Sequence, residues 1–214
     1  NDKGQPWTLG EELATRFGKS SPVLTVSGAC ASGTMAVING AMKIAAGECE
    51  KVLIVAIDLL SEFVLTGFDS LKALSLEQAR PFDSKRDGLS LGDGAAWMLL
   101  SAEDVVKKRG EHLAAIDCFS VTCDATHITA PCRDGSGLKA LLKNIYREKT
   151  YPVGAIHAHG TGTLYNDAME LLSFSEMCED DMPVCSVKGA LGHSLGATGA
   201  IEVLLSCLSM RDKI

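Results

Sequence analysis

The feature of this sequence that most restricts its fold is a pattern that occurs once in each half. An apolar stretch leads into a turn of very small residues, and a helix that opens with small residues follows. In the first half "PVLTVSGACASG" places Cys30 in that turn, and in the second half "VKGALGHSLGATGAIE" places His193 just before the helix. This order indicates a weak internal duplication within a layered α/β protein.

Strand, helix and strand follow one another in the first half. We predict a buried strand over residues 22–28, a helix over 31–46 that stops at Gly47, and a second buried strand over 51–58. This spacing is typical of a βαβ unit.

The rest of the chain continues the alternation. A turn-rich charged segment precedes a strand over residues 95–100, and a helix with a linker over 101–113 divides the chain near its middle. Beyond it we predict three strands and three helices. The strands are expected over residues 114–121, 152–160 and 182–189, and the helices over 135–149, 167–178 and 196–210.

Composition limits the classes of function. The 214 residues carry a formal net charge of −7, which argues against broad nucleic-acid binding. No apolar run approaches the length of a membrane span, and the polar start lacks the features of a signal peptide. Eight cysteines occur at irregular spacings without a C-x-x-C pair, so we expect neither a metal site nor a disulfide framework. We therefore expect a cytoplasmic protein with reduced thiols.

Cys30 is the first candidate for chemistry. A thiolate is a nucleophile, and the start of a helix stabilises it through the helix dipole and free backbone N–H groups. The same N–H groups could hold a developing oxyanion. The small neighbours would let a bulky substrate approach closely. The alternative at this stage is a small core cysteine at a tight joint between strand and helix.

Two further segments place polar groups after apolar stretches. "HAHGTGTLYND" releases His159 into a glycine-rich loop, where α/β proteins expose catalytic groups, although a hydrogen-bonded core histidine is the alternative. His157 would lie on the same face of the predicted strand as His159. We prefer His159 as the catalytic candidate because the glycines follow it directly. Lys188 ends the next apolar stretch, where a buried cation would need an anionic partner, and Glu170 is a candidate for it.

Taken together, these segments resemble the β-ketoacyl synthases of the thiolase superfamily, of the elongating type with a Cys-His-His site. "GACASG" matches the nucleophile segment, and the segments around His159 and His193 match the two histidine segments. Lys188 and Glu170 match the family's site lysine and acidic residue. The resemblance implies a thiolase-like layered α-β-α-β-α fold with two duplicated halves, incomplete at both ends. Residues 1–105 would belong to the first half and residues 112–214 to the second.

The resemblance also implies a reaction. Cys30 would take an acyl group from a carrier protein, and malonyl carrier protein would then decarboxylate and condense with it, giving a 3-oxoacyl thioester. His159 and His193 would stabilise the negative charge, with Lys188 and Glu170 orienting them. Thr161 and Thr163 would contact the phosphopantetheine arm, and no metal or organic cofactor is implied. The implied partners are acyl carrier protein and a second synthase subunit, in a homodimer or a heterodimer.

Several features depart from the family pattern. The family's "GEG" appears as Gly92-Asp93-Gly94, and its Gly-Asp after "HGTGT" appears as Asn166-Asp167. The chain is also much shorter than a complete family member. A non-catalytic partner subunit resembling a chain-length factor is therefore the alternative hypothesis. Against it, such partners typically lose the nucleophile, and Cys30 is present with both histidines. A thiolase or an initiating synthase is disfavoured by the two-histidine pattern.

Overall fold

The computed structural model describes residues 5–18, 22–110, 112–127 and 130–213. Helices and strands alternate irregularly along the chain. The first half contains α1 (Pro6–Arg16), α2 (Ser32–Ala45), β1 (Lys51–Asp58), α3 (Glu62–Ser70), β2 (Gly94–Ser101) and α4 (Glu103–Arg109). The second half contains α5 (Ser136–Glu148), β3 (Ile156–His157), α6 (Leu164–Met177), β4 (Val184–Cys185), α7 (Lys188–Leu191) and α8 (Leu195–Asp212).

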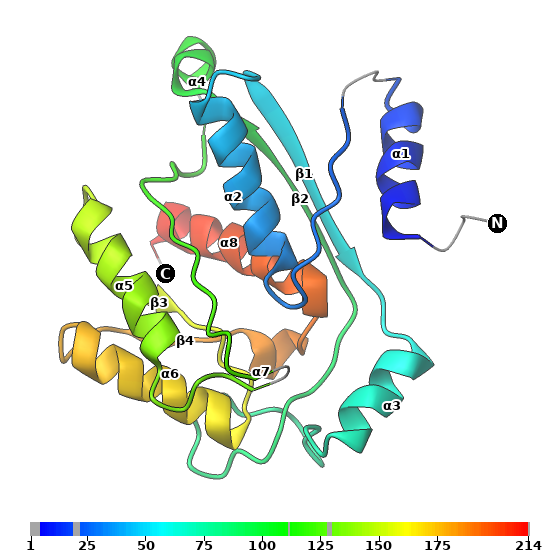
Figure 1. Ribbon diagram of the computed structural model, residues 1–214. Coiled ribbons are helices and arrows are strands. Elements are labelled where there is room, and N and C mark those ends of the chain that lie inside the picture. The colour runs from blue at the N-terminus through cyan, green and yellow to red at the C-terminus, as the bar shows by residue number, and fades with distance from the viewer. Residues whose placement is uncertain (1–4, 19–21, 111, 128–129, 214) are drawn as a thin grey trace.

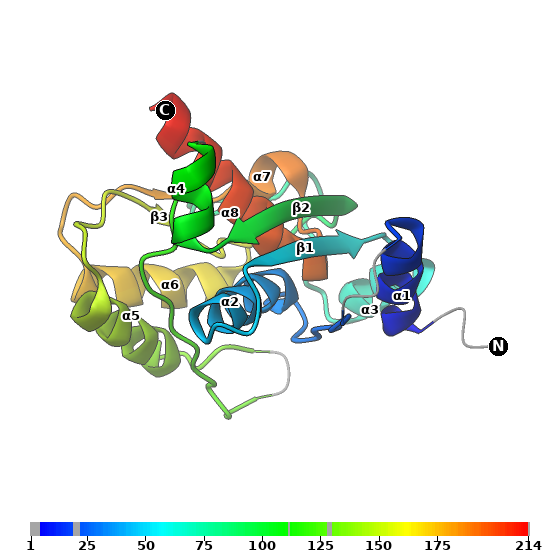
Figure 2. The same ribbon diagram turned by 90° about the horizontal axis from the view of Figure 1, so that it is seen from above.

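The centre of the molecule is an antiparallel ladder of β1 and β2 covered by two helices. Lys51 pairs with Ser101 at one end of the ladder and Asp58 pairs with Gly94 at the other. Helices α2 and α8 lie side by side and pack against this ladder (Figures 1 and 2). Every second side chain of each strand points toward the two helices. These side chains form the hydrophobic core together with side chains of α2 and α8. The core consists of Val37, Ile54, Ala56, Ala96, Met98, Ala197 and Ala200.

Small residues bring α2 and α8 into close contact. A Cβ atom placed on Gly33 would lie 2.6 Å from the backbone nitrogen of Ala200. A Cβ atom placed on Gly199 would lie 2.7 Å from the backbone nitrogen of Thr34. Real Cβ atoms do not approach backbone atoms so closely, so glycine is required at both positions. The helix from the first half therefore packs directly on the helix from the second half.

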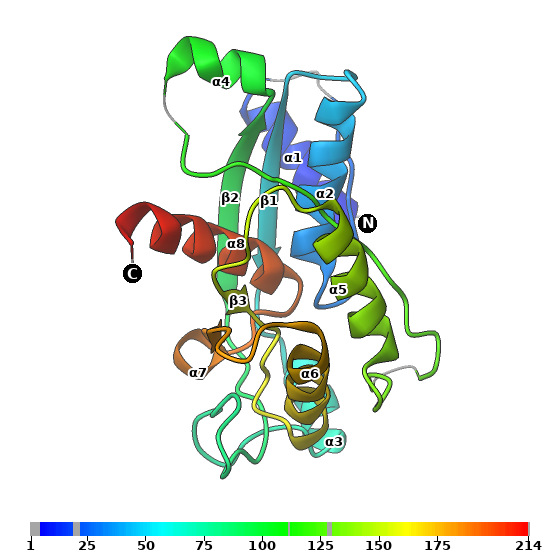
Figure 3. The same cartoon turned by 90° about the vertical axis from the view of Figure 1, so that its left-hand side faces the viewer.

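The second half has its own short sheet. Strands β3 and β4 pair in parallel, with Ile156 opposite Val184, and α6 forms the connection between them. Helix α5 packs beside α6, as Figure 3 shows. A parallel pair joined through a helix is the usual βαβ arrangement. The loop after β3 continues into α6, and the turn after β4 continues into α7 and then α8.

Most predicted elements are present. The strands predicted at residues 51–58 and 95–100 form β1 and β2, and every predicted helix has a counterpart in the structure. The strands predicted at 152–160 and 182–189 are much shorter than expected, and Lys188 begins helix α7 instead of ending a strand. Helices α1 and α3 were not predicted.

Two predicted strands are wrong. Residues 22–27 and residues 114–121 have no regular secondary structure, and the side chains of Val23 and Leu24 are exposed. An apolar β-branched run forms a strand only when a neighbouring strand accepts its backbone hydrogen bonds. The predicted βαβ unit of the first half is consequently absent, and β1 pairs with β2 in the antiparallel sense.

The outer face of the β1–β2 ladder is apolar and exposed. The side chains that point away from α2 and α8 are large and hydrophobic, and Trp97 is 69% exposed. From the continuous apolar stretches we predict strands that are buried on both faces, whereas in the structure only the face toward α2 and α8 is buried. The exposed side chains on this face are Leu53, Val55, Ile57, Trp97 and Leu99. No helix within the described residues is long and apolar enough to cross a membrane.

Candidate active site

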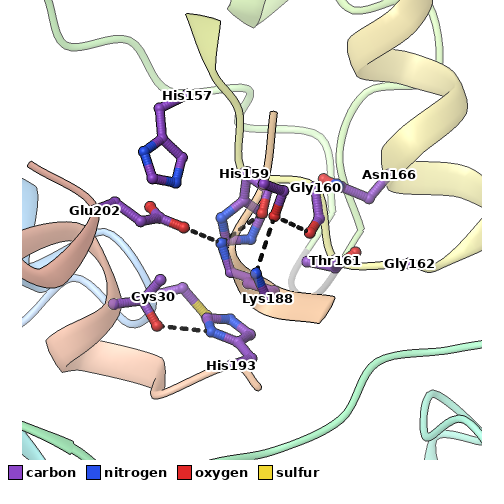
Figure 4. A network of polar contacts seen from close by, with 12 residues as sticks. Cys30, His157, His159, Gly160, Thr161, Gly162, Asn166, Lys188, His193 and Glu202 are labelled. Atoms are coloured by element: carbon purple, nitrogen blue, oxygen red, sulfur yellow. Dashed lines mark hydrogen bonds and ion pairs between the residues drawn. The ribbon is translucent and has the colours of Figure 1, made fainter. Parts of the chain in front are cut away.

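Cys30 lies in the turn that leads into α2, and its thiol faces the second half of the chain. The residue before it, Ala29, has a φ angle of +50°, a left-handed conformation that costs energy for any residue with a Cβ atom. This turn directs the half-buried thiol toward α8. The Sγ atom lies 3.0 Å from Nε2 of His193, so the two groups are in direct contact (Figure 4).

His193 is held rigidly between the end of α7 and the start of α8. Its backbone N–H donates to the carbonyl of Ser90 at 2.7 Å, and its Nδ1 atom lies 2.9 Å from the hydroxyl of Thr198. The side chain is 1% exposed. Burial, assisted by the positive charge of Lys188, lowers the pKa of His193 to about 4. The imidazole is therefore neutral near pH 7.

His159 completes the cluster from the loop after β3. Its ring meets that of His193 edge to face, with 5.3 Å between the ring centroids and 83° between the planes. Nitrogen atoms of both rings and the Cys30 sulfur lie within 4.8 Å of one another. Burial, Lys188 and then His193 lower the pKa of His159 to about 3. His157 instead places Nδ1 2.9 Å from the hydroxyl of Ser206, so the structure brings the preferred histidine to the site.

Lys188 is 1% exposed, and its charge acts on both histidines. Its ammonium group donates to the carboxylate of Glu202 at 2.5 Å and to the backbone carbonyl of His159. The expectation that Glu170 is the anionic partner of this lysine is wrong. Glu202 takes that place because it lies about two turns into α8, within reach of Lys188, the first residue of α7.

Glu170 supports the site through the backbone. Its carboxylate accepts hydrogen bonds from the N–H groups of His159 at 2.8 Å and Gly160 at 2.7 Å, and from the side-chain amide of Asn166 at 2.9 Å. Burial raises the pKa of Glu170, while these donors act in the opposite direction. The carboxylate therefore fixes the loop that carries the first histidine.

Asp167 performs a similar task for the next part of that loop. It is fully buried and accepts from the N–H groups of Thr161 at 3.0 Å and Gly162 at 3.2 Å. It also accepts from the N–H of Phe82 at 2.8 Å. The hydroxyl groups of Thr161 and Thr163 lie 2.9 Å apart. Thr161 is almost completely buried, and Thr163 is the more accessible of the two.

A cavity of about 300 Å³ opens beside Cys30. Burial raises the pKa of the Cys30 thiol, while Lys188 and the backbone N–H of the cysteine lower it. The negative charges of Asp58 and Glu202 add to the rise. The thiol is therefore protonated at neutral pH. The cavity is lined by Ser27, Ala29, Cys30, Ser32, Asp58, Phe68, Leu195 and Gly196.

The thiol and the two imidazoles are close enough to share a metal ion. Within the described parts of the chain they form the only such group of three side chains. The buried ammonium of Lys188 beside them disfavours a second cation at this place. The arrangement is better suited to holding negative charge, because two neutral imidazoles present N–H donors and a positive charge lies behind them.

Sequence reasoning missed three supporting residues. Glu202 is the one carboxylate in an otherwise small and apolar helix segment, which is a signal of a buried ion pair. Asp167 was noted only as part of a departure from the family pattern. Asp58 ends a predicted strand, and nothing in the sequence indicates that it reaches the start of α8.

Comparisons with known proteins cover nearly the whole chain. The family model described as "Beta-ketoacyl synthase, N-terminal domain" matches residues 3–105, and the one described as "Beta-ketoacyl synthase, C-terminal domain" matches residues 113–214. The ketoacyl synthase alpha subunit of tetracenomycin polyketide synthase from Streptomyces glaucescens is 34% identical over 98% of this chain and 52% of its own length. A 3-oxoacyl-[acyl-carrier-protein] synthase 2 from Vibrio harveyi is 33% identical over 94% of this chain and 52% of its own length.

Solved structures give the same result. A type II polyketide synthase acyl-carrier protein in complex with its ketosynthase matches with a TM-score of 0.91 and 26% identity, over 98% of this chain and 55% of that one. A β-ketoacyl synthase from Burkholderia phymatum matches with a TM-score of 0.89 and 31% identity, over 97% and 53%. These matches confirm the predicted thiolase-like fold. The chain spans about half the length of the curated relatives it matches.

Proposed function

The chain belongs to the β-ketoacyl synthase family, and on this premise we propose that it acts as a 3-oxoacyl-[acyl-carrier-protein] synthase. The reaction is a decarboxylative Claisen condensation between an acyl group held on Cys30 and a malonyl carrier protein. The observation that carries this proposal is the contact of 3.0 Å between Cys30 Sγ and His193 Nε2, with His159 in the same cluster.

The first step is acyl transfer. The sulfur of Cys30 attacks the carbonyl carbon of an acyl thioester on the carrier protein, and a new carbon–sulfur bond forms. The bond to the carrier sulfur breaks, and the proton of the Cys30 thiol ends on the carrier thiol. The apolar cavity beside Cys30 offers room for the acyl chain. The covalent intermediate divides one difficult condensation into two easier steps.

The second step is carbon–carbon bond formation. Malonyl thioester loses carbon dioxide, and the electron pair left behind attacks the acyl carbon on Cys30, which releases the Cys30 sulfur. Negative charge develops on the malonyl thioester oxygen during decarboxylation. The neutral imidazoles of His159 and His193 are suited to donate N–H groups to that oxygen. Burial, assisted by the positive charge of Lys188, lowers the pKa of both rings and so keeps them unprotonated for this role.

Carrier protein is the proposed partner, and its phosphopantetheine arm would pass Thr161 and Thr163. No metal or organic cofactor takes part in the proposed reaction. The solved relatives include a ketosynthase with its acyl-carrier protein and a ketosynthase in complex with its chain length factor from Xenorhabdus doucetiae. A reducing compartment such as the cytoplasm is part of this proposal.

The test is a search for the covalent intermediate. The protein is incubated with an octanoyl carrier-protein thioester, and the peptide that contains Cys30 is examined by mass spectrometry. We expect an added octanoyl group on this peptide and none on the peptide with the exposed Cys123. The Cys30→Ala variant should carry no adduct. An unmodified Cys30 in the wild-type protein would overturn the proposal and favour a non-catalytic partner subunit.

The histidine roles have a separate test. Malonyl carrier protein is supplied without an acyl donor, and the release of carbon dioxide is measured. Replacing His159 or His193 with alanine should lower the rate about 10²- to 10³-fold, the usual effect of losing one donor to a developing oxyanion. Unchanged rates in both variants would contradict the assignment.

A further inference from the structure

Asp58 is the last residue of β1, and its carboxylate lies on the wall of the cavity that contains Cys30. It is the only acidic residue among those that line this cavity. The reaction described above gives this carboxylate no task. A negative charge beside a nucleophilic thiol is unexpected, because it opposes the formation of a thiolate.

The hydrogen bond of Asp58 indicates one role. Its Oδ2 atom accepts from the backbone N–H of Gly196 at 3.0 Å. Gly196 is the second residue of α8, so this N–H is one of those that the helix itself leaves unpaired. A carboxylate is the preferred partner there because it also interacts favourably with the helix dipole. The end of β1 thus caps the helix that begins two residues after His193.

Because Gly196 is closely packed, this capping contact also holds neighbouring segments in place, and we call it a clamp. A Cβ atom on Gly196 would lie 3.1 Å from Oδ2 of Asp58, 3.7 Å from Cβ of Ser32 and 3.8 Å from the carbonyl oxygen of Ala29. The end of β1, the nucleophile turn and the first turn of α8 therefore meet at one point. A shift of any one of them would move Cys30 relative to His193.

The charges around the thiol indicate a second role. Lys188, His159 and His193 face Cys30 from the second half, and Glu202 lies behind Lys188. With both imidazoles neutral, Lys188 is the positive charge, among the described residues, that favours the thiolate. Asp58 opposes it from the side of the cavity, and its charge contributes to the raised pKa of the thiol.

We propose that Asp58 is a positioning residue for Cys30 and His193, which clamps the start of α8 through Gly196 and opposes a second negative charge on the sulfur. This inference rests on the proposed role of Cys30 as the nucleophile. A thiol kept protonated in the empty cavity reacts slowly with other electrophiles, because the thiolate is the reactive form. The carboxylate therefore protects the nucleophile between turnovers.

The charge is tested by alkylation. The rate of modification of Cys30 by iodoacetamide is measured from pH 6 to pH 10, by mass spectrometry of the peptide that contains it. In Asp58→Asn we expect the rate curve to move to lower pH and the rate at pH 7 to rise about two- to threefold. The matched control is Asp104→Asn on the exposed face of α4, which should follow the wild-type curve. An Asp58→Asn curve that also follows the wild type, or moves to higher pH, would overturn the proposal.

Two further variants separate the clamp from the charge. Asp58→Glu keeps the charge and Asp58→Ala removes it, so their alkylation curves decide the question even if Asp58→Asn does not fold. Acyl transfer from octanoyl-N-acetylcysteamine to Cys30 should fall about tenfold in Asp58→Ala and much less in Asp58→Asn, whose amide oxygen still accepts from Gly196. Equal rates in these two variants would contradict the clamp. If wild-type Cys30 is not acylated at all, the proposed function fails, while the alkylation curves still report on Asp58.

Discussion

Lys188 and Glu202 form an ion pair that is almost completely removed from water, with side-chain exposures of 1% and 15%. Replacing Lys188 with methionine leaves the Glu202 carboxylate buried without its partner. We expect a loss of about 3–5 kcal/mol in the free energy of unfolding, as is usual when one member of a buried pair is removed. Urea unfolding measures this loss.

The double variant Lys188→Met with Glu202→Gln is the internal check. Because no charge is left unpaired, it should recover part of the stability lost in the single variant. The matched surface control is Lys107→Met, which breaks an exposed pair with Glu103 on α4 and should cost about 0.5 kcal/mol or less. If Lys188→Met and Lys107→Met lowered the free energy of unfolding equally, burial of the ion pair would not contribute to stability.

His193 should make stability depend on pH. Its pKa is about 4 in the folded protein and has an ordinary value of 6.5, so the unfolded chain binds the extra proton. Stability is therefore lost as the pH falls below 6.5 toward 4. At pH 5 this contribution amounts to about 2 kcal/mol relative to pH 7.5. Urea unfolding at the two pH values should show that His193→Gln lacks this part of the loss.

A matched control uses the exposed His112, where His112→Gln should leave the acid loss unchanged. Burial also raises the pKa of Glu170 and Glu202. These carboxyl groups gain protons more readily in the folded state, so they act in the opposite direction and stabilise the fold as the pH falls. The comparison of variants isolates the histidine. A His193→Gln variant with the same acid loss as the wild type would contradict this account.

At the scale of single residues, sequence reasoning located the centre of the site but not its supports. Cys30, His159 and His193 each stand beside several glycines or alanines at the end of an apolar stretch, and that local pattern is visible in the chain. Asp58 acts on Gly196, 138 residues away in the sequence, and Glu202 acts on Lys188, which lies in another helix. Their partners depend on how α8 packs, which no local pattern contains.

Among the elements, the contact between α2 and α8 decides the geometry of the site. Gly33→Ala would place a methyl group 2.6 Å from the backbone nitrogen of Ala200 and 3.0 Å from the carbonyl oxygen of Gly196. Backbone atoms cannot move aside, so the helices must separate. We expect a loss of about 1–3 kcal/mol in the free energy of unfolding and slower acylation of Cys30. Thermal unfolding and the acyl-transfer assay measure the two effects.

Gly67 provides the comparison, since it also lies within a helix and a Cβ atom there meets nothing within 4 Å. Gly67→Ala should be neutral or stabilising by about 0.5–1 kcal/mol, because alanine is the better helix former. If both substitutions have the same effect, the close approach of α2 and α8 does not control stability.

Helices were predicted more successfully than strands, for a physical reason. A helix such as α5 satisfies its own backbone hydrogen bonds, so a periodic local pattern is sufficient to indicate it. A strand depends on a partner elsewhere. Residues 51–58 pair with β2, whereas residues 22–27 and 114–121, which are also rich in apolar side chains, pair with no strand in the described part of the chain. The unpredicted α1 and α3 are helices without buried side chains.

For the whole molecule, we expect the exposed apolar segment before Cys30 to form the contact between two subunits. Leu24 is 61% exposed and Val23 is 45% exposed. A backbone segment of this kind can pair with the same segment of a second subunit. Sedimentation velocity should show a dimer for the wild-type protein and a shift toward monomer in Leu24→Lys. A control substitution at the exposed Leu76, Leu76→Lys, should leave the dimer intact.

A wild-type protein that sediments as a monomer at all concentrations would contradict a homodimer. Adding a related synthase subunit would then test the heterodimer.

At this scale the sequence predicted the layered α/β architecture and its repeated halves through the matching turns around Cys30 and His193. It did not predict that one face of the β1–β2 ladder is exposed, because an apolar run does not specify which of its faces is covered.

The packing of α2 on α8 also bears on how the protein is made. Cys30 leaves the ribosome more than 160 residues before His193 follows it. Throughout that interval the sulfur has neither its imidazole neighbour nor the buried ammonium that favours its ionisation. Activity toward a carrier thioester therefore requires that α8 has docked, and until then a half-synthesised or misassembled chain exposes Cys30 without the burial that raises the pKa of its thiol in the folded protein.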